Sequence, residues 1–511
     1  MMRQKSVVTL LIVLFLLMCI VVAFAQGKVR KAGVAGAFYP ANPDELKNMV
    51  NGFLAKAQVP PTNDPLIALI APHAGYPYSG GVAAFSYAAL KNRKFQRVVI
   101  IAPSHYDGFP FSAVYDGDAY VTPLGKIPVD KVFAAKLAAQ SNSIRLSSRG
   151  HERSGEQSEH SLEVQLPFLQ RTLAQFELVP IIMGDQSYEA SRALGVTLAR
   201  LIGNSDTLIV ASSDLSHYHP YEEASAIDHN TLHAIQAWDY YDLSRNLQSR
   251  VWEACGGGPI VAAMMAAERL GANRAELLKY ANSGDVTGDR SRVVGYSAFA
   301  LYKSSAKSGV ESPFSLTAEE KQELLSIARK SAETAVRERK QYLPPPASPA
   351  LQQDRGAFVT INKNGDLRGC IGYIAPLQSL IDTVRDVAAY AVSRDPRFPP
   401  VTAAELGELQ YEVSVLSPLR RVLDVKEIQV GQHGLLMKKG GHEGVLLPQV
   451  PGEFGWDRKT FLEETARKAG LPASAWKDDD TDIFMFTALV FGESITPKSP
   501  TPDASSPVKR P

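Results

Sequence analysis

The segment LIALIAPHAGY (66–76) sets the expectation for the fold. Its first six residues form a short, continuous apolar run, which is typical of a strand buried on both faces of a sheet. Two later segments repeat this pattern, VVIIAPSH (98–105) and LIVASSDLSH (208–217). Because helical patterns lie between the three runs, residues 28–303 are predicted to form a layered α/β domain.

Each apolar run leads into side chains suited to metal or proton chemistry. His73 follows the first run, His105 follows the second, and Asp214 and His217 follow the third. Ligands of open α/β sheets bind beyond the carboxyl ends of the strands. One histidine after a strand is commonly structural, but three such endings in one domain predict a shared site at one edge of the sheet.

A cysteine is a further candidate for this site. Cys255 stands in ACGGGPI (254–260), where the glycines let the backbone approach closely and leave the thiol accessible. The alternative is a small buried hydrophobe, the usual role of a free cysteine. Two imidazoles and one thiolate would form a three-ligand set with an open position, as in catalytic zinc sites or in iron and copper redox sites. This donor set favours Cu, Zn or Fe over Mg or Ca.

His160 and Glu163 form a second candidate pair in EHSLEVQL (159–166). Because they are three residues apart, they would share one face if the segment is helical. They are either a solvated surface pair or residues that support the metal ligands or contact the substrate.

Five segments, taken in order, resemble the Memo family: APHAGYPYSG (71–80), IAPSHYDG (101–108), EHSLEVQLPFL (159–169), SSDLSHY (212–218) and CGGGPI (255–260). The resemblance covers residues 28–303. It implies a fold similar to that of the class III extradiol (LigB-type) dioxygenases, which use non-haem iron. Memo proteins are not established dioxygenases, so ring cleavage does not follow from the resemblance.

The resemblance also implies roles for individual residues. His73, His105 and Cys255 match the metal ligands of the family. Asp214 and His217 match catalytic residues, and the position of His217 acts in acid–base catalysis in the dioxygenases. The third ligand of those enzymes is a carboxylate, whereas here it is the Cys255 thiolate. The expected metal is Fe(II) or Cu(I), with Zn less favoured.

The second half of the chain has its own cysteine motif. Cys370 lies in DLRGCIGY (366–373), between two glycines and two residues after Arg368. A neighbouring cation lowers the pKa of a thiol and raises its reactivity. The alternative is a buried structural cysteine. The segment RDPRFPP (394–400) is predicted to be a rigid loop of alternating charge. The alternative to a functional role is a structural turn held by salt bridges.

Four segments resemble the AMMECR family: FVTINKNGDLRGCIGYI (358–374), SRDPRFPPVTAAEL (393–406), YEVSVLSPL (411–419) and VLLPQVPGEFGWDRKTFLEETARKAGLP (445–472). The resemblance covers residues 316–493 and implies an α+β domain. The activity of that family is unsettled. Its LRGCIG motif implies a site at Arg368, Gly369 and Cys370, with Cys370 as a catalytic residue and with Asp395 and Arg397 as neighbours.

The fusion of two such domains also points to partners. Memo-like and AMMECR-like proteins occur with a radical S-adenosylmethionine protein in a three-component system, which we abbreviate AmmeMemoRadiSam. The resemblance therefore implies that protein as a partner, and a small molecule or peptide as the substrate. The sequence has no Cys-x₃-Cys-x₂-Cys motif, so it does not contain the radical component.

The composition limits the class of protein. A chain of 511 residues fits two or three domains. Lys and Arg number 54 against 53 Asp and Glu, so binding of nucleic acid through global charge is not expected. With only 3 cysteines, the chain is not a disulfide scaffold.

The N-terminus predicts export. Arg3 and Lys5 precede an apolar run (7–22) that leads to Ala23-Phe24-Ala25, the pattern of a secretory signal peptide spanning 1–25. Cleavage would leave no transmembrane segment and would place the protein in the periplasm or outside the cell. The alternative is an uncleaved anchor, for which the apolar run is short.

The boundaries between the parts follow from composition. Residues 304–315 are predicted to be a linker, and a capping box of Thr317 and Glu320 predicts that a helix begins directly after it. The Pro- and Ser-rich residues 494–511 are predicted to be a disordered tail.

Two functions follow as hypotheses. One is a metal-dependent redox enzyme in which Asp214 and His217 move protons beside an open metal position. The other is a non-catalytic module that binds copper, iron or a peptide.

Overall fold

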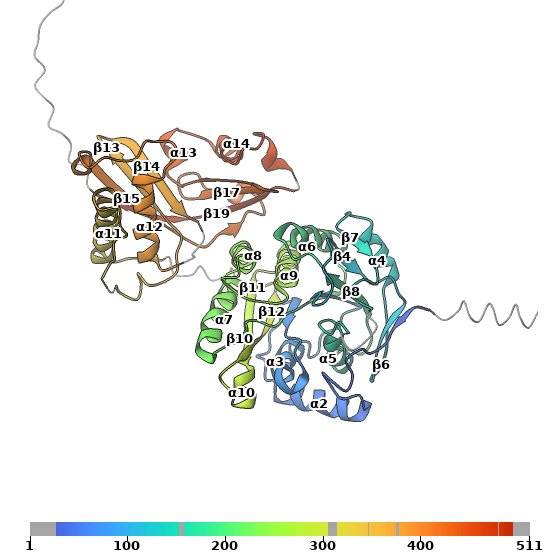
Figure 1. Ribbon diagram of the computed structural model, residues 1–511. Helices are drawn as coiled ribbons and strands as arrows, with labels where there is room; N and C mark the ends of the chain where they lie inside the picture. The colour runs from blue at the N-terminus through green and yellow to red at the C-terminus, as the bar shows by residue number, and fades with distance from the viewer. Residues whose placement is uncertain are drawn as a thin grey trace, which may run out of the picture. The chain divides into compact units, whose positions relative to one another are not determined.

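The computed structural model describes residues 27–152, 158–304, 314–345, 347–374, 378–478 and 480–493. The chain divides into two compact units at residues 309 and 310 (Figure 1). The predicted signal peptide and tail and most of the predicted linker lie outside the described residues. Within the described ranges, no helix is both long and apolar enough to cross a membrane.

The first unit is built on a nine-stranded sheet whose central strands are parallel. The three predicted strands are confirmed as β2 (Leu66–Ala71), β3 (Arg97–Pro103) and β9 (Thr207–Ser212). Strand β9 lies between the other two, and β8 (Glu177–Met183) pairs with the far side of β3. The carboxyl ends of β2, β9 and β3 therefore lie next to one another.

Other strands complete the sheet on both sides. Beyond β2, the sheet continues with β12 (Val293–Tyr302), which pairs with β11 (Arg274–Asn282) and with β10 (His217–His219). Beyond β8 come β4 (Ser112–Val114) and β7 (Ile144–Leu146). A separate small sheet contains β1 (Val29–Arg30), β5 (Ala119–Thr122) and β6 (Gly125–Pro128).

Helices cover both faces of the central strands, which explains their continuous apolar sequences. One face packs against a core that includes side chains from α2 (Pro43–Lys56), α3 (Tyr76–Ala88) and α5 (Leu166–Thr172). Helix α9 (Gly257–Arg269) also packs on β2, β9 and β3, and it contacts α6 (Tyr188–Ile202). The remaining helices of the unit are α4 (Lys131–Ala138), α7 (Tyr221–Gln236), α8 (Tyr240–Gln248) and α10 (Ser283–Thr287).

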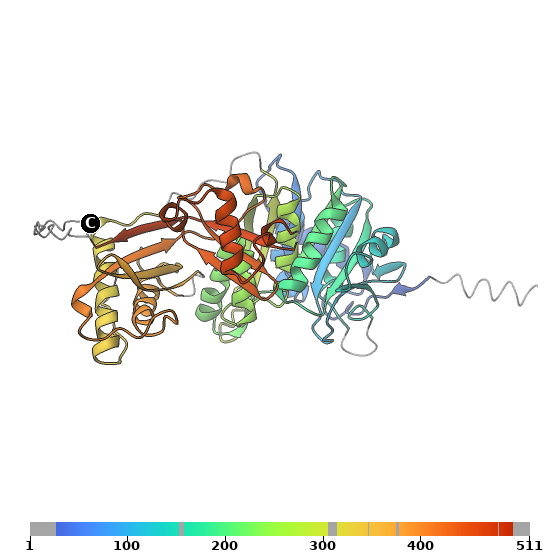
Figure 2. The same ribbon diagram turned by 90° about the horizontal axis from the view of Figure 1, so that it is seen from above.

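The second unit is α+β and has two four-stranded antiparallel sheets. The predicted capping box is confirmed: Thr317 caps α11 (Ala318–Arg337), which Figure 2 shows in yellow beside the orange strands. With α12 (Leu380–Ser393), α11 packs on the first sheet, whose order is β14 (Asp366–Tyr373), β13 (Ala357–Lys363), β15 (Leu409–Leu416) and β20 (Ala488–Gly492). The second sheet has the order β16 (Arg420–Arg421), β19 (Asp482–Phe486), β17 (Gly434–Lys439) and β18 (His442–Leu446), accompanied by α13 (Val450–Glu453) and α14 (Arg458–Lys468).

Candidate metal centre

The adjacent ends of the central strands bring the candidate residues of the first unit together. His73 follows β2, His105 follows β3, and Asp214 follows β9. The rings of His73 and His105 meet edge to face, with their centroids 5.0 Å apart. Residues separated by more than a hundred positions thus share one edge of the sheet.

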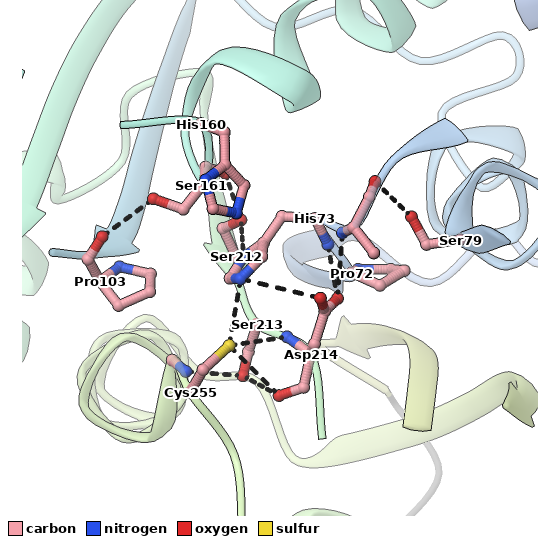
Figure 3. A network of polar contacts seen from close by, with 12 residues as sticks. Pro72, His73, Ser79, Pro103, His160, Ser161, Ser212, Ser213, Asp214 and Cys255 are labelled. Carbon is pink, nitrogen blue, oxygen red and sulfur yellow. Dashed lines mark hydrogen bonds and ion pairs between the residues drawn. The ribbon is translucent and has the colours of Figure 1, made fainter. Parts of the chain in front are cut away.

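Cys255 reaches the same place from the segment that leads into α9. Its backbone N–H donates to the Asp214 carbonyl over 3.2 Å, and its Sγ lies 3.0 Å from Nε2 of His73 (Figure 3). This approach requires the glycine that follows, because a Cβ on Gly256 would lie 2.2 Å from the carbonyl oxygen of Ser212. The sequence here is glycine because the backbone passes so close to β9.

The candidate ligand atoms, one from each of His73, His105 and Cys255, all lie within 4.8 Å of one another. That spacing suits a single ion held by two nitrogens and one sulfur. The donors of His105, Glu159 and His160 meet the same criterion. In that second set, however, the Glu159 carboxylate is already engaged by backbone and ring N–H groups.

The hydrogen bonds around His73 assign its tautomer. Ser212 Oγ donates to the carbonyl of Ser161 over 2.5 Å and accepts from Gln165 Nε2 over 2.7 Å. The hydroxyl proton is thereby used, so the 2.9 Å contact with His73 requires that Nδ1 of the ring be the donor. Nε2 of His73 therefore carries a lone pair, and this is the nitrogen that faces Cys255.

Glu159 accepts the Nδ1 hydrogen bond of His105, as Ser212 does for His73. One carboxylate oxygen accepts from Nδ1 of His105 over 2.9 Å, and the other accepts from its backbone N–H over 2.7 Å. The backbone N–H groups of His160 and Ser161 also donate to this carboxylate. Burial raises the pKa of Glu159, but the hydrogen bonds and charge of His105, together with the Ser161 N–H, outweigh it, so the net pKa lies well below the usual value. The ionised carboxylate holds the Nδ1 proton and leaves Nε2 of His105 free to bind a metal.

Burial sets the charge of the remaining groups. It lowers the pKa of His160 to about 3 and the pKa of His73 well below its ordinary value, so both imidazoles are neutral at neutral pH. Burial, followed by the Asp214 carboxylate, raises the pKa of the Cys255 thiol. A metal that binds here therefore displaces the thiol proton.

Asp214 and His217 lie beside these donors. Asp214 accepts the backbone N–H of His73 over 2.7 Å, and burial raises the pKa of its carboxyl group. His217 begins β10, and its Nδ1 lies 2.8 Å from the carbonyl of Leu215, which can only accept. Nδ1 of His217 is therefore the donor in this contact, and Nε2 is left for other partners. Its backbone N–H donates to Glu253 over 3.1 Å.

The predicted pairing of His160 with Glu163 on one helix face is wrong. The helical segment begins at Glu163, and His160 precedes it, with its carbonyl accepting the backbone N–H of Val164 over 3.1 Å. His160 stacks on the ring of His105 at 4.7 Å, with its buried Nδ1 lacking a hydrogen-bond partner. Glu163 instead forms a fully buried ion pair with Arg30 and accepts from Tyr39, so it anchors the start of the domain rather than the site.

The structure adds two supporting residues, Glu159 and Ser212, that the sequence reasoning missed. Glu159 directly precedes His160 in the quoted EHSLE segment, and Ser212 ends an apolar run. Their polarity beside candidate histidines was the available signal. Their partners lie 54 and 139 positions away, which spacing along the chain does not reveal.

In the second unit, Asp395 and Arg397 cap the backbone of Cys370. Strand β14 is an edge strand, and the Cys370 N–H donates to Asp395 over 2.8 Å while Arg397 donates to the Cys370 carbonyl over 3.1 Å. The two side chains are ion-paired at 2.7 Å. They occupy the hydrogen-bonding groups that an exposed edge would offer to another strand.

The expected cation beside the Cys370 thiol is Arg397 rather than Arg368. Burial raises the pKa of this thiol, although a hydrogen bond from Thr360 and the charge of Arg397 oppose the rise. Arg368 pairs with Glu405 over 3.1 Å. Gly369 serves packing, because a Cβ there would lie 2.3 Å from the carbonyl oxygen of Ala391 in α12.

The comparisons with known proteins match the two units separately. Residues 30–300 match the family model described as Memo-like protein, and residues 325–491 match the model described as AMMECR1. A MEMO1 family protein of Nitrosopumilus maritimus is 37% identical over 275 residues, which cover 53% of this chain and 98% of that protein. A protein of Thermococcus kodakarensis is 44% identical over 188 residues, which cover 35% of this chain and 91% of that protein.

A solved structure also matches part of the chain. The crystal structure of an uncharacterized protein from Pyrococcus horikoshii is 40% identical and covers 35% of this chain and 93% of its own, with a TM-score of 0.34.

Proposed function

Because this chain belongs to the Memo family and also carries an AMMECR1 domain, we propose that it is a metal-dependent redox enzyme on a dioxygenase-like fold. Fe(II) or Cu(I) would be held by His73, His105 and Cys255. The observation that carries the proposal is the hydrogen bonding of the two imidazoles. Nδ1 of each ring faces a fixed acceptor, and each ring also has a ligand atom within 4.8 Å of one of Cys255. This is the arrangement in which histidines bind metals.

The donor set supports the choice of metal. Thiolate and imidazole suit copper, iron and zinc, whereas Mg²⁺ and Ca²⁺ prefer oxygen ligands. Zinc fits the same donors but has no redox chemistry, which makes it the less favoured cofactor. When bound, Fe(II) or Cu(I) would supply Lewis acidity and one-electron redox chemistry at a position that the three protein ligands leave open.

The residues around this position would handle protons. The Leu215 carbonyl fixes the ring orientation of His217 through Nδ1, so Nε2 would take up or release a proton as the general base or acid. Asp214 holds the backbone at His73 and Ala74 through one carboxylate oxygen, and its other oxygen lies 3.9 Å from Nε2 of His73. His160 would contact the substrate with a neutral ring.

The proposal also includes export of the protein and a partner protein. The charged start, apolar run and Ala-x-Ala ending of residues 1–25 support a cleaved signal peptide and a periplasmic or secreted enzyme. The pairing of a Memo-like with an AMMECR1 domain supports work in the AmmeMemoRadiSam system, with a radical S-adenosylmethionine protein as partner. The substrate would be a small molecule or a peptide.

The test is anaerobic reconstitution of the full chain with Fe(II), Cu(I) and Zn(II) in parallel, followed by elemental analysis. We expect about one Fe or Cu ion per chain in the wild type and in His229→Ala, an exposed control. His73→Ala and Cys255→Ser should lose most of the metal. Full metal content in Cys255→Ser would refute the ligand set.

Oxygen uptake by the reconstituted protein then separates enzyme from binding module. We expect uptake with an electron-rich phenolic compound such as catechol, and its loss in His217→Ala with metal content unchanged. Metal binding without turnover of any tested compound would favour the sequestering module instead.

A further inference from the structure

A strained tyrosine stands directly after the candidate general base. Tyr218 has φ +65°, in the left-handed region that bulky residues rarely adopt. It lies in strand β10, where the pairing with β12 is irregular between His217 and His219. Bulges of this kind re-aim side chains next to active sites, and backbone strain of this kind clusters at functional sites. The side chain of Tyr218 is directed outward and is 61% exposed.

An arginine lies over this tyrosine. The guanidinium carbon of Arg292 is 5.1 Å from the centroid of the Tyr218 ring. The Tyr218 ring also meets the His217 ring edge to face, with their centroids 5.7 Å apart. Arg292 directly precedes β12, which pairs with β10, so the three residues belong to adjacent segments. Arg292 and Tyr218 are exposed, whereas His217 is half-buried.

Arg290 and the carboxylates of Glu222, Glu223 and Glu253 have ionic partners, whereas Arg292 has none among the described residues. Arg290 lies over the Tyr221 ring at 3.7 Å and is ion-paired with Glu222 at 3.3 Å. Glu253 contacts His219 at 2.8 Å, and so does Glu223 at 3.2 Å. Among the residues described in this unit, no carboxylate lies within ion-pair distance of the Arg292 guanidinium. This group is exposed and oriented by the aromatic ring, so its N–H donors remain available to a ligand.

The same surface lies close to the metal centre. Gly295 in β12 accepts from the backbone N–H of Leu215 over 2.9 Å and donates to the carbonyl of Ser216 over 3.0 Å. Leu215 and Ser216 directly follow Asp214, so β12 lies next to the residues of the candidate metal centre. In Figure 1, β10, β12 and α10 gather at this end of the sheet.

We propose that Arg292, held over Tyr218, is an anion-recognition subsite for the substrate. It would bind a carboxylate or phosphate group through paired N–H donors and turn the reacting end of the molecule toward His217. The inference rests on the proposed function for the assignment of His217, and it adds that the substrate is anionic.

Calorimetric titration of the full chain with benzoate, phenyl phosphate and benzamide tests this subsite. Benzamide has nearly the shape of benzoate without its charge. We expect at least one of the two anions to bind about 10-fold more tightly than benzamide, since hydrogen bonds to charged groups are the strong ones. The preferred anion identifies the chemistry of the substrate group, and its affinity should fall with added salt.

Two matched variants locate the effect. Arg292→Ala should remove the preference for the anion, whereas Arg290→Ala should keep it, because Arg290 is already neutralised by Glu222. Equal binding of anion and benzamide by the wild type would overturn the proposal, as would no binding of any probe. An equal loss in both arginine variants would overturn it too.

The titration is carried out on both metal-free and reconstituted protein. A preference that depends on Arg292 in protein that fails to take up metal supports the anion subsite and refutes the metal centre. Metal uptake without any anion preference refutes only the subsite.

Discussion

Nδ1 of His105 donates a hydrogen bond to the carboxylate of Glu159 over 2.9 Å. The other oxygen of the same carboxylate accepts a hydrogen bond from the backbone N–H of His105. One buried acid thus fixes the position, the ring orientation and the tautomer of a candidate metal ligand. His73 has a neutral hydroxyl, Ser212, in the equivalent position. An anionic acceptor raises the basicity of an imidazole more than a neutral one, so the two histidines would be unequal ligands.

Glu159→Gln should weaken metal binding about 10- to 100-fold, because the Nδ1 proton of His105 loses its charged acceptor. Chelator competition on the purified full chain measures this affinity. The control is Glu253→Gln, whose carboxylate contacts His217 and His219 but none of the three ligands. An affinity within twofold of the wild type in Glu159→Gln would show that the contact has no role in metal binding.

Glu163→Ala should act on stability instead. The Arg30–Glu163 pair is buried at both ends, with side chains 6% and 0% exposed, and removal of one partner leaves an unpaired buried charge. Loss of such a partner typically costs about 3–5 kcal/mol. Denaturant titration of the first unit measures the loss, and metal affinity of the folded protein should stay close to wild type. A large loss of affinity with unchanged stability would return Glu163 to the metal centre.

Gly256→Ala should both destabilise the first unit and weaken metal binding, because the added Cβ would lie 2.2 Å from the Ser212 carbonyl and push Cys255 away. The matched control is Gly81→Ala in α3, where nothing lies within 4 Å of the added Cβ. That change should be neutral or stabilise by up to about 1 kcal/mol. Thermal unfolding and chelator competition together check both expectations. Wild-type behaviour of Gly256→Ala would disprove the close approach.

The second unit should lose stability in acid, because protonation of Asp395 removes the stabilisation that its carboxylate provides. Its pKa is lowered to about 2, chiefly by Arg397, while an unfolded aspartate titrates near 3.9. The resulting stability is fully present above about pH 4 and is lost as the pH falls through 2, and it amounts to about 2 kcal/mol. Denaturation of wild type and Asp395→Asn at pH 6 and pH 2.5 measures it. The two proteins should differ more at pH 6, and a constant difference would contradict the assignment.

The Cys370 thiol should react slowly. Because burial raises its pKa above the ordinary value, alkylation at pH 7.5 should be slower than for the same residue in urea-unfolded protein. Mass spectrometry of the labelled peptide gives the rate. Arg397→Ala should slow the reaction further if the structure around the thiol is kept, since the Arg397 charge favours the thiolate. A rate at or above that of the unfolded chain would support an activated nucleophile in LRGCIG.

The pattern of the sequence predicted the elements well and their arrangement only in part. The apolar runs 66–71, 98–102 and 208–211 became β2, β3 and β9, because only a strand covered on both faces has such a composition. The Thr317 cap was equally local. The position of β9 between β2 and β3 has no local signal, yet it is this order that gathers the candidate ligands.

The residues that the sequence pattern misplaces or misses also depend on contacts without a local signal. His160 and Glu163 were expected on one helix face, but the helical segment begins too late for that. The role of Glu159 has no local signal although the residue is adjacent to His160, because this carboxylate accepts hydrogen bonds from His105, 54 residues away. In the second unit, the loop at 394–400 turned out to cap an edge strand.

The sequence by itself determined the secondary structure, the two-part organisation and the residues with chemistry to offer, since these depend on local patterns of side chains. Only the tertiary structure decided which of those residues meet and which nitrogen of each histidine is free. A tautomer is set by the donors and acceptors that surround a ring. For His73 and His105, these come from Ser212 and Glu159, which are far along the chain. The parallel pairing of β2 with β9 brings Ser212 to His73, and the segment before the helical residues 163–165 brings Glu159 to His105.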